Sequence, residues 1–180
     1  MLDVKDIKGL SDKSIYSLYT DVPYNFGQNA VFVELGCFTG QSTIFLAQQC
    51  MRQNKNQVIY AVDIWQNMIG PGVEGSNFFL FWENVIKYQA EQYIRPIMYD
   101  SSRAAQMFPD RSVDFVYVDA DHSYNKCWDD IVSWLPKLKL NSWIGGHDYN
   151  QHVRKCVDKL FGKTNVHNLL DQSWLVKFER

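Results

Sequence analysis

Residues 30–48 read AVFVELGCFTGQSTIFLAQ, and this stretch decides the fold. It opens with an apolar, β-branched run that is typical of a buried strand, and the run ends at Glu34. A turn of small residues follows over 36–40, and a hydroxyl side chain at 42 or 43 can cap the helix that begins there. Strand, glycine turn and helix in this order predict the opening of a nucleotide-binding βαβ unit. In such a unit, backbone N–H groups and the positive end of a helix face the ligand.

Strand and helix patterns alternate along the rest of the chain. The expected later strands are 57–63, 94–99, 113–118 and 140–144, and the expected later helices are 78–92, 101–107, 124–138 and 151–161. Residues 165–168 and 173–179 are expected to form a closing hairpin. This order predicts an α/β, Rossmann-like, doubly wound and mostly parallel seven-stranded sheet with a C-terminal antiparallel hairpin. We expect a single domain over residues 1–180, in which 1–29, with a short helix before a break at Pro23 and Gly27, form an N-terminal cap.

Composition and charge narrow the class of protein. The net charge is −2 and no basic run stands out, so nucleic acid is not favoured as a partner. The first ten residues mix charges and lack the apolar core of a signal peptide, and no window approaches the roughly 18 apolar residues of a membrane span. The four cysteines form no C-x-x-C pair, which favours free buried thiols in a reducing compartment. We therefore expect a cytoplasmic protein.

Polar groups stand at the ends of the five expected parallel strands. They are Glu34, Asp63, Asp100, Asp119 and the pair His147-Asp148. In open parallel sheets, ligands bind in the crevice outside the carboxyl ends of the strands. An acid buried there without a partner would be costly, and separate salt bridges for all five are a strained explanation. The pattern therefore predicts one ligand site at this edge of the sheet.

The glycine turn does not match the two commonest phosphate-binding loops. A dinucleotide fingerprint that started at Gly36 would need glycine where Phe38 and Gln41 stand. A Walker-type loop would need a lysine, which the GQS sequence of 40–42 lacks. What remains is an acid-x-Gly-x-x-x-Gly pattern, with Asp63 at the end of the next strand. A carboxylate at that position suits the two hydroxyls of a ribose.

With these residues in place, the chain resembles the class I S-adenosylmethionine-dependent methyltransferases. The resemblance rests on residues 34–40 (ELGCFTG), Asp63, Asp100-Ser101 and Asp119, in this order, and it covers the chain from residue 30 onward. Residues 118–124 (VDADHSY) and 145–149 (GGHDY) resemble the small O-methyltransferase branch that includes macrocin-type and caffeoyl-CoA-type enzymes.

The resemblance implies a set of residues that contact S-adenosylmethionine. They are Glu34, Gly36, Cys37, Phe38, Gly40, Ser42, Asp63, Ile64, Trp65, Asp100, Ser101 and Asp119. Within the set, Asp63 would accept hydrogen bonds from the ribose hydroxyls, and Asp100 with Ser101 would meet the adenine. Trp65 could stack on the adenine ring. A helix N-cap is the structural alternative for Asp100 and Ser101.

The same branch often holds a divalent metal between acids at the ends of the fourth and fifth strands. The resemblance thus implies a metal site of Asp119, His147 and Asp148, filled by Mg²⁺ or Mn²⁺. An imidazole ligand would move the preference from Mg²⁺ toward Mn²⁺, Fe²⁺ or Zn²⁺. Relatives often carry two adjacent acids or an acid–amide pair where this chain has His147-Asp148, which leaves the metal open. The alternative is that these two residues cap the following helix.

Catalysis is expected from Asp119, His122 and His147. The unperturbed pKa of histidine suits His122 to taking a proton from a hydroxyl, while packing against Tyr124 and orienting Asp119 is its alternative role. We expect methyl transfer to a hydroxyl of a small-molecule acceptor, under a lid formed by loop 64–77, with a pocket that a homodimer could complete. A cephalosporin-hydroxylase-like enzyme and a non-catalytic S-adenosylmethionine-binding or interaction domain are the alternatives. A nicotinamide-dependent reductase is disfavoured by the glycine pattern.

Overall fold

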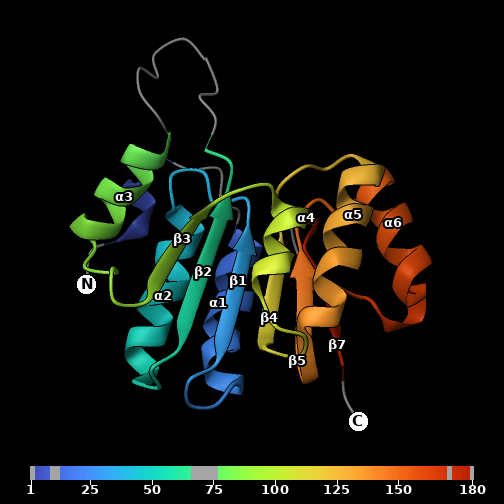
Figure 1. Cartoon of the computed structure of the whole chain (residues 1–180), viewed down its shortest axis with the longest axis horizontal. Coiled ribbons are helices and arrows are strands. Elements are labelled where there is room, and N and C mark those ends of the chain that lie inside the picture. The colour runs from blue at the N-terminus through green and yellow to red at the C-terminus, as the bar shows by residue number, and fades with distance from the viewer. Residues whose placement is uncertain (1–2, 9–12, 66–76, 170–171, 179–180) are drawn as a thin grey trace.

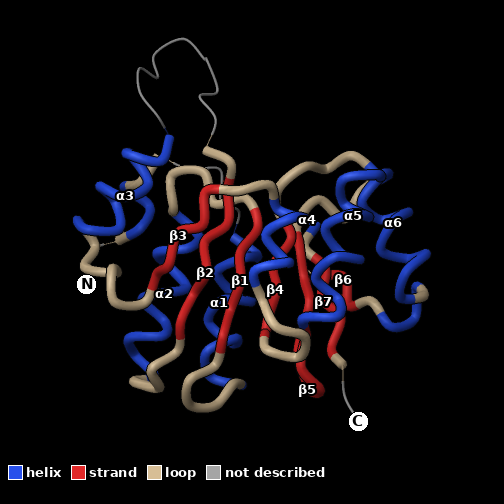
Figure 2. The backbone as a smooth tube through the Cα atoms, viewed as in Figure 1, coloured by secondary structure: helices blue, strands red, loops and turns tan. Residues whose placement is uncertain are grey.

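The computed structural model describes residues 3–8, 13–65, 77–169 and 172–178. A seven-stranded sheet divides the molecule, with strand order β3-β2-β1-β4-β5-β7-β6 (Figure 2). Its strands are β1 Val31–Leu35, β2 Val58–Asp63, β3 Ile94–Met98, β4 Val113–Val118, β5 Leu138–Gly146, β6 His167–Asn168 and β7 Trp174–Lys177. Strands β1 to β5 are parallel, whereas β7 pairs antiparallel with both β5 and β6. The predicted sheet and C-terminal hairpin are confirmed.

Helices cover both faces of the sheet (Figure 1). They are α1 Lys13–Asn25, α2 Gln41–Gln53, α3 Asn77–Lys87, α4 Ser101–Ala104, α5 Tyr124–Trp134 and α6 Gln151–Phe161, with 3₁₀ turns η1 Val4–Asp6, η2 Ala105–Met107, η3 Leu135–Lys137 and η4 Lys163–Asn165. One apolar core joins α1, α2 and α3 to the sheet, and a second joins α4, α5 and α6 to its other face. Successive strand residues supply the two cores in turn, as Phe32 and Val33 do.

The chain leaves the centre of the sheet in two directions. From β1 it winds outward through β2 to β3, and it then returns to β4 on the other side of β1. The order of winding therefore reverses between β1 and β4, and this is where open α/β sheets bind their ligands. The predicted ligand site therefore lies outside the carboxyl ends of β1 and β4.

Helix α1 continues past Pro23, where the sequence predicted a break, and ends at Asn25. The proline sits in the last turn of the helix, where it cannot donate the i→i−4 hydrogen bond, and the helix ends two residues later. Lys55 donates through Nζ to three carbonyl groups at this helix end, at 2.9 to 3.1 Å. Gln57 donates to two of the same carbonyls and to one beyond them. Side chains far along the sequence therefore satisfy the helix end.

The N-terminal segment packs at the glycine turn. Gln41 donates through Nε2 to the carbonyls of Val4 and Ile7, and Thr39 donates to the carbonyl of Lys8 at 2.5 Å. The predicted lid lies mostly at 66–76, outside the described residues. None of the helices within the described ranges combines the length and the apolar character that crossing a membrane requires.

Candidate active site at the carboxyl end of the sheet

The glycine turn after β1 lies directly against the end of β4. Gly36 and Gly40 both have φ +87°, a conformation that side chains rarely adopt. A Cβ atom on Gly36 would lie 2.2 Å from the carbonyl oxygen of Asp119, which is too close for any side chain. Only glycine at this position lets the glycine turn touch the strand that carries Asp119.

Asp63 holds this turn in place from the end of β2. Its Oδ2 accepts hydrogen bonds from the N–H groups of Cys37 and Phe38, each at 2.8 Å, and its Oδ1 accepts one from Trp65 at 2.7 Å. A carboxylate offers about four lone-pair positions, so three are in use. One position remains for a ribose hydroxyl, where the sequence suggested that Asp63 accepts from two. The predicted ribose contact itself stays a prediction.

Trp65 lies in the protein core. It is 4% exposed, its Nε1 donates to the carbonyl of Phe38 at 2.9 Å, and its ring packs against Phe78 and Phe81. The stacking on adenine that the sequence suggested does not fit this burial, because little of the indole is left for a ligand. Ile64, by contrast, is 50% exposed beside Asp63. It presents the apolar surface at this strand end.

Glu34 lies beneath the turn and is fully buried. Ser42 donates to its Oε1 at 2.5 Å, while Oε2 has no hydrogen-bond partner among the described residues. Burial raises the pKa of Glu34 to about 7, and the nearby hydroxyls of Ser42, Thr43 and Tyr19 oppose this rise. Of these three hydroxyls, that of Ser42 forms a hydrogen bond with the Glu34 carboxylate. Tyr19 belongs to α1 and was missed by the sequence reasoning, because residues 1–29 carry little pattern.

The side chains of Asp100 and Ser101 are engaged within the protein. Asp100 caps α4, where its Oδ1 accepts from the hydroxyl of Ser102 at 2.7 Å and from the N–H of Arg103 at 3.1 Å. These bonds, led by the one from Ser102, lower the pKa of Asp100. The hydroxyl of Ser101 donates to Asp130 of α5 at 2.5 Å. The N-cap alternative is therefore realised for Asp100, and an adenine contact would use its other oxygen or the backbone.

Three groups converge beyond the ends of β4 and β5. Asp119, His122 and Asp148 each offer a ligand atom, and these atoms all lie within 4.8 Å of one another. The closest pair is His122 Nδ1 and Asp148 Oδ2, at 2.6 Å. Asp148 has φ +52°, a left-handed conformation that is uncommon outside glycine. The chemistry-bearing groups of two strands and one loop thus meet beside the glycine turn.

His147 also lies close to both acids of this group. Its Nδ1 is 3.8 Å from Asp119 Oδ1 and 3.6 Å from Asp148 Oδ2. The sequence placed His147 with the two acids, and the structure adds His122, which comes from the loop after β4 and lies closer to Asp148 than His147 does. Neither His147 nor Asp148 caps the next helix, because Asn150 occupies the N-cap of α6.

The electrostatics of this cluster favour a cation. Burial raises the pKa of Asp119, and the negative charges of Glu34 and Asp148 raise it further. Two carboxylates and an imidazole are a donor set that binds divalent metals, and a bound cation would relieve the repulsion between the acids. The residues present therefore fit the metal that the resemblance implies.

The other predicted cofactor residues lie in the turn and face inward. The Sγ of Cys37 is buried and donates to the carbonyl of Glu34 at 3.4 Å, and the hydroxyl of Ser42 is bound to the same residue's carboxylate. The ring of Phe81 lies 2.9 Å from where a Cβ on Gly40 would be. A ligand would therefore meet this turn mainly through its backbone.

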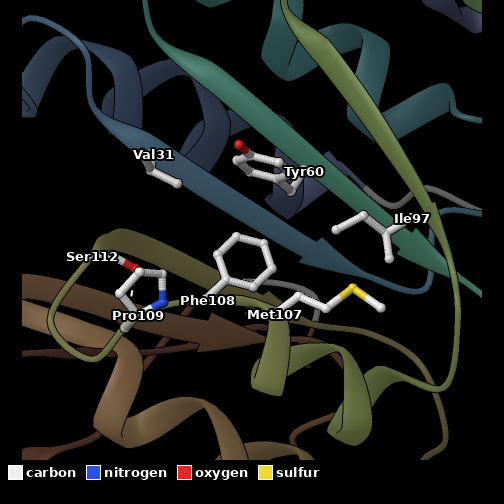
Figure 3. Close-up of a pocket in the computed structure, with 7 residues that line it drawn as sticks. All are labelled: Val31, Tyr60, Ile97, Met107, Phe108, Pro109 and Ser112. Atoms are coloured by element: carbon white, nitrogen blue, oxygen red, sulfur yellow. Dashed lines mark hydrogen bonds between the residues drawn. The ribbon is translucent and has the colours of Figure 1, made fainter.

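A groove of about 230 Å³ opens elsewhere on the sheet (Figure 3). It is lined by Val31, Tyr60, Ile97, Met107, Phe108, Pro109 and Ser112. None of the acids or histidines at the carboxyl edge reaches it. The groove is therefore separate from the candidate active site.

Comparisons with known proteins agree with this geometry. A family model described as a methyltransferase domain matches residues 33–149, which is more than half of the chain. A curated relative, an uncharacterized protein from Sinorhizobium fredii, is 29% identical over 119 residues. That match covers 64% of this chain and only 13% of the relative, so the chain spans a small part of that protein's length.

Solved structures of similar fold cover nearly the whole chain. A SAM-dependent O-methyltransferase from Thermotoga maritima has a TM-score of 0.71 at 11% identity, over 99% of this chain and 70% of that one. A putative caffeoyl-CoA O-methyltransferase from Staphylococcus aureus has a TM-score of 0.68 at 13% identity, over 98% of this chain and 88% of that one. An rRNA methylase from Streptococcus thermophilus has a TM-score of 0.66 at 12% identity, over 96% of this chain and 99% of that one. At these identities the likeness shows the fold.

Proposed function

The chain belongs to the methyltransferase domain family, and on this premise we propose that it moves a methyl group from S-adenosylmethionine to a hydroxyl oxygen of a small molecule. A divalent metal held at Asp119 and Asp148 is part of the proposal. The observation that carries it is the contact between the glycine turn at Gly36 and the backbone of Asp119. This contact sets the glycine turn directly beside the cluster of acids and histidines, which supports the proposal.

The chemistry that this arrangement supports is a direct displacement. The acceptor oxygen attacks the methyl carbon, a carbon–oxygen bond forms, and the carbon–sulfur bond breaks. The sulfonium is already reactive, so the main task of the protein is to align oxygen, carbon and sulfur in one line. A bound divalent ion would lower the pKa of the acceptor hydroxyl.

The proton of the acceptor hydroxyl needs a base at the sheet edge. His122 and His147 are the two imidazoles there, and Asp148 lies 2.6 Å from one and 3.6 Å from the other. A carboxylate beside an imidazole orients the ring and stabilises its protonated form. Either ring could therefore receive the proton.

A small acceptor is proposed over nucleic acid because the net charge is −2 and no basic run stands out. Two proteins of similar structure are an rRNA methylase and a putative rRNA methylase, so RNA belongs in the test as a competitor. A homodimer that completes the acceptor pocket is also proposed, and gel filtration of the purified chain measures it.

The test joins calorimetry with a transfer assay. We expect S-adenosylmethionine and its demethylated product to bind, and labelled methyl to pass to hydroxylated small molecules when Mn²⁺ or Mg²⁺ is present. Asp148→Asn should reduce transfer at least about tenfold, whereas Asp129→Asn, an exposed control on α5, should not. If neither S-adenosylmethionine nor its demethylated product binds, the proposal is refuted. Binding without transfer to any acceptor would favour the non-catalytic alternative.

A further inference from the structure

The candidate metal cluster includes the imidazole of His122, to which the family resemblance assigns no metal contact. Asp119 follows β4, His122 stands in the loop before α5, and Asp148 follows β5, so three separate segments each contribute one donor atom. The atoms all lie within 4.8 Å of one another. Metal–ligand bonds of about 2.0 to 2.2 Å allow donors up to about 4.4 Å apart. A shift of about half an ångström is enough for all three to hold one ion.

Backbone contacts hold this cluster in place. The N–H of Asp119 donates to the carbonyl of Leu35 at 2.8 Å, and that of His147 donates to the carbonyl of Val118 at 3.1 Å. The N–H of Tyr149 donates to the carbonyl of Gln172 at 2.7 Å. The ends of β1, β4 and β5 are therefore locked together, and the carboxylates of Asp119 and Asp148 are presented by rigid strand ends.

The side chains are enclosed on one side and open on the other. Those of Asp119 and Asp148 are 29% and 28% exposed, and that of His122 is 47% exposed. Partial exposure leaves room for an ion to enter and for an acceptor oxygen or water to complete its coordination. The hydrogen-bonded pair of His122 Nδ1 and Asp148 Oδ2 would give way to two metal bonds, and the imidazole proton would pass to solvent.

The nitrogen donor decides which ions fit. Mg²⁺ prefers oxygen ligands and keeps several waters, whereas imidazole suits Mn²⁺, Fe²⁺, Co²⁺ and Zn²⁺ better. We infer that His122 is a direct metal ligand together with Asp119 and Asp148, and that the site selects a divalent transition ion over Mg²⁺. The inference deepens the proposed function, on which it rests for the role of the ion. Metal binding itself can be measured without any methyl transfer.

A consequence concerns the base. If Nδ1 of His122 binds the ion, that residue is committed to coordination. His147, whose Nδ1 is 3.8 Å from Asp119 and 3.6 Å from Asp148, is then the imidazole that receives the acceptor proton. The two histidines thereby take different roles at one edge.

Titration of the purified chain with CoCl₂, MnCl₂ and MgCl₂ alone tests the inference. Calorimetry should give one Co²⁺ or Mn²⁺ per chain, bound at least about tenfold more tightly than Mg²⁺, and Co²⁺ should show the visible absorption of a nitrogen-ligated ion. His122→Ala should weaken Co²⁺ binding by about 10- to 100-fold and Mg²⁺ binding by less than about threefold. The exposed His152 of α6 supplies the control, and His152→Ala should leave both unchanged.

Two results would overturn the inference. One is unchanged Co²⁺ affinity in His122→Ala, and the other is a loss of Co²⁺ binding in His147→Ala that exceeds the loss in His122→Ala. S-adenosylmethionine binding by each variant, measured by calorimetry, shows whether the site is folded. Cofactor binding without selective Co²⁺ binding would reject this inference and leave the methyl-transfer proposal standing. Selective Co²⁺ binding without cofactor binding would reject the methyl-transfer proposal and leave this inference standing.

Discussion

Asp63 shows how one residue can build a site before any ligand arrives. Its carboxylate gathers the backbone N–H groups of Cys37, Phe38 and Trp65, and so joins the turn after β1 to the end of β2. Hydrogen bonds to a charged acceptor are each worth about 1.5 to 3 kcal/mol. Asp63 therefore holds the glycine turn in shape, and a contact with a ribose would be a second role of the same carboxylate.

Asp63→Asn tests this scaffolding role. The amide keeps one oxygen, loses the charge, and places an NH₂ group where a backbone N–H donates. We expect a lower melting temperature and an S-adenosylmethionine affinity reduced by at least about tenfold, since each lost charged bond costs about as much as a factor of ten. Calorimetry and thermal unfolding measure the two effects. Asp129→Asn is the matched control, and equal behaviour of the two variants would contradict the role.

At the scale of elements, the close approach of the glycine turn to β4 depends on one missing side chain. Gly36 has φ +87° and faces the carbonyl of Asp119. The backbone of β4 cannot move aside, because the N–H of Asp119 is bonded to the carbonyl of Leu35. A methyl group at Gly36 would therefore separate the turn from the strand.

Gly36→Ala should thus destabilise the protein by more than about 3 kcal/mol and abolish cofactor binding, because steric overlap and an unfavourable φ add together. Gly27→Ala is the matched control, since nothing lies within 4 Å of the Cβ it would add. Urea unfolding and calorimetry compare the two. A Gly36→Ala protein as stable as Gly27→Ala would show that the turn has room to move.

Strand β3 forms one edge of the sheet, and its sequence protects that edge. The N–H of Tyr99 donates to the carbonyl of Asp63 in β2, so by alternation position 97 also faces β2 and position 96 faces outward. Pro96 stands at the outward position, where a missing N–H breaks no bond within the sheet. The proline thereby removes a donor that another strand could pair with.

At the scale of the whole molecule, buried acids set the dependence of stability on pH. Burial raises the pKa of Glu34 to about 7 and that of Asp130 to about 6, from the ordinary values of 4.5 and 3.8. At pH values between the unfolded and the folded pKa of each acid, the folded chain keeps a proton that the unfolded chain has lost. Their stabilising contribution is complete below pH 4 and is lost as the pH rises through 6 and 7.

Glu34→Gln should therefore flatten the fall in unfolding free energy between pH 5 and pH 8. The shift of Glu34 corresponds to about 3 kcal/mol, and glutamine still offers an oxygen to Ser42. Urea unfolding in chelator at both pH values measures the difference, with Asp129→Asn as control. An unchanged slope in Glu34→Gln would mean that Glu34 does not titrate in this range.

The sequence alone determined the order of strands and helices, the glycine turn and the edge where the acids meet. Each of these depends on local periodicity, or on the rule that parallel strands end at one edge. It could not show that Pro23 stays within α1, because the Lys55 and Gln57 side chains that satisfy the helix end lie about thirty residues away.

Only the tertiary structure decided how the site is shared among these residues. It buried Trp65, occupied three positions of Asp63, and brought His122 as well as His147 to the two acids. A loop can bring a side chain that is distant in sequence to a strand end, as the loop before α5 does with His122. The glycine turn could be read from the sequence because its conformation is local, whereas the cluster opposite it depends on distances between β4, β5 and the loop before α5.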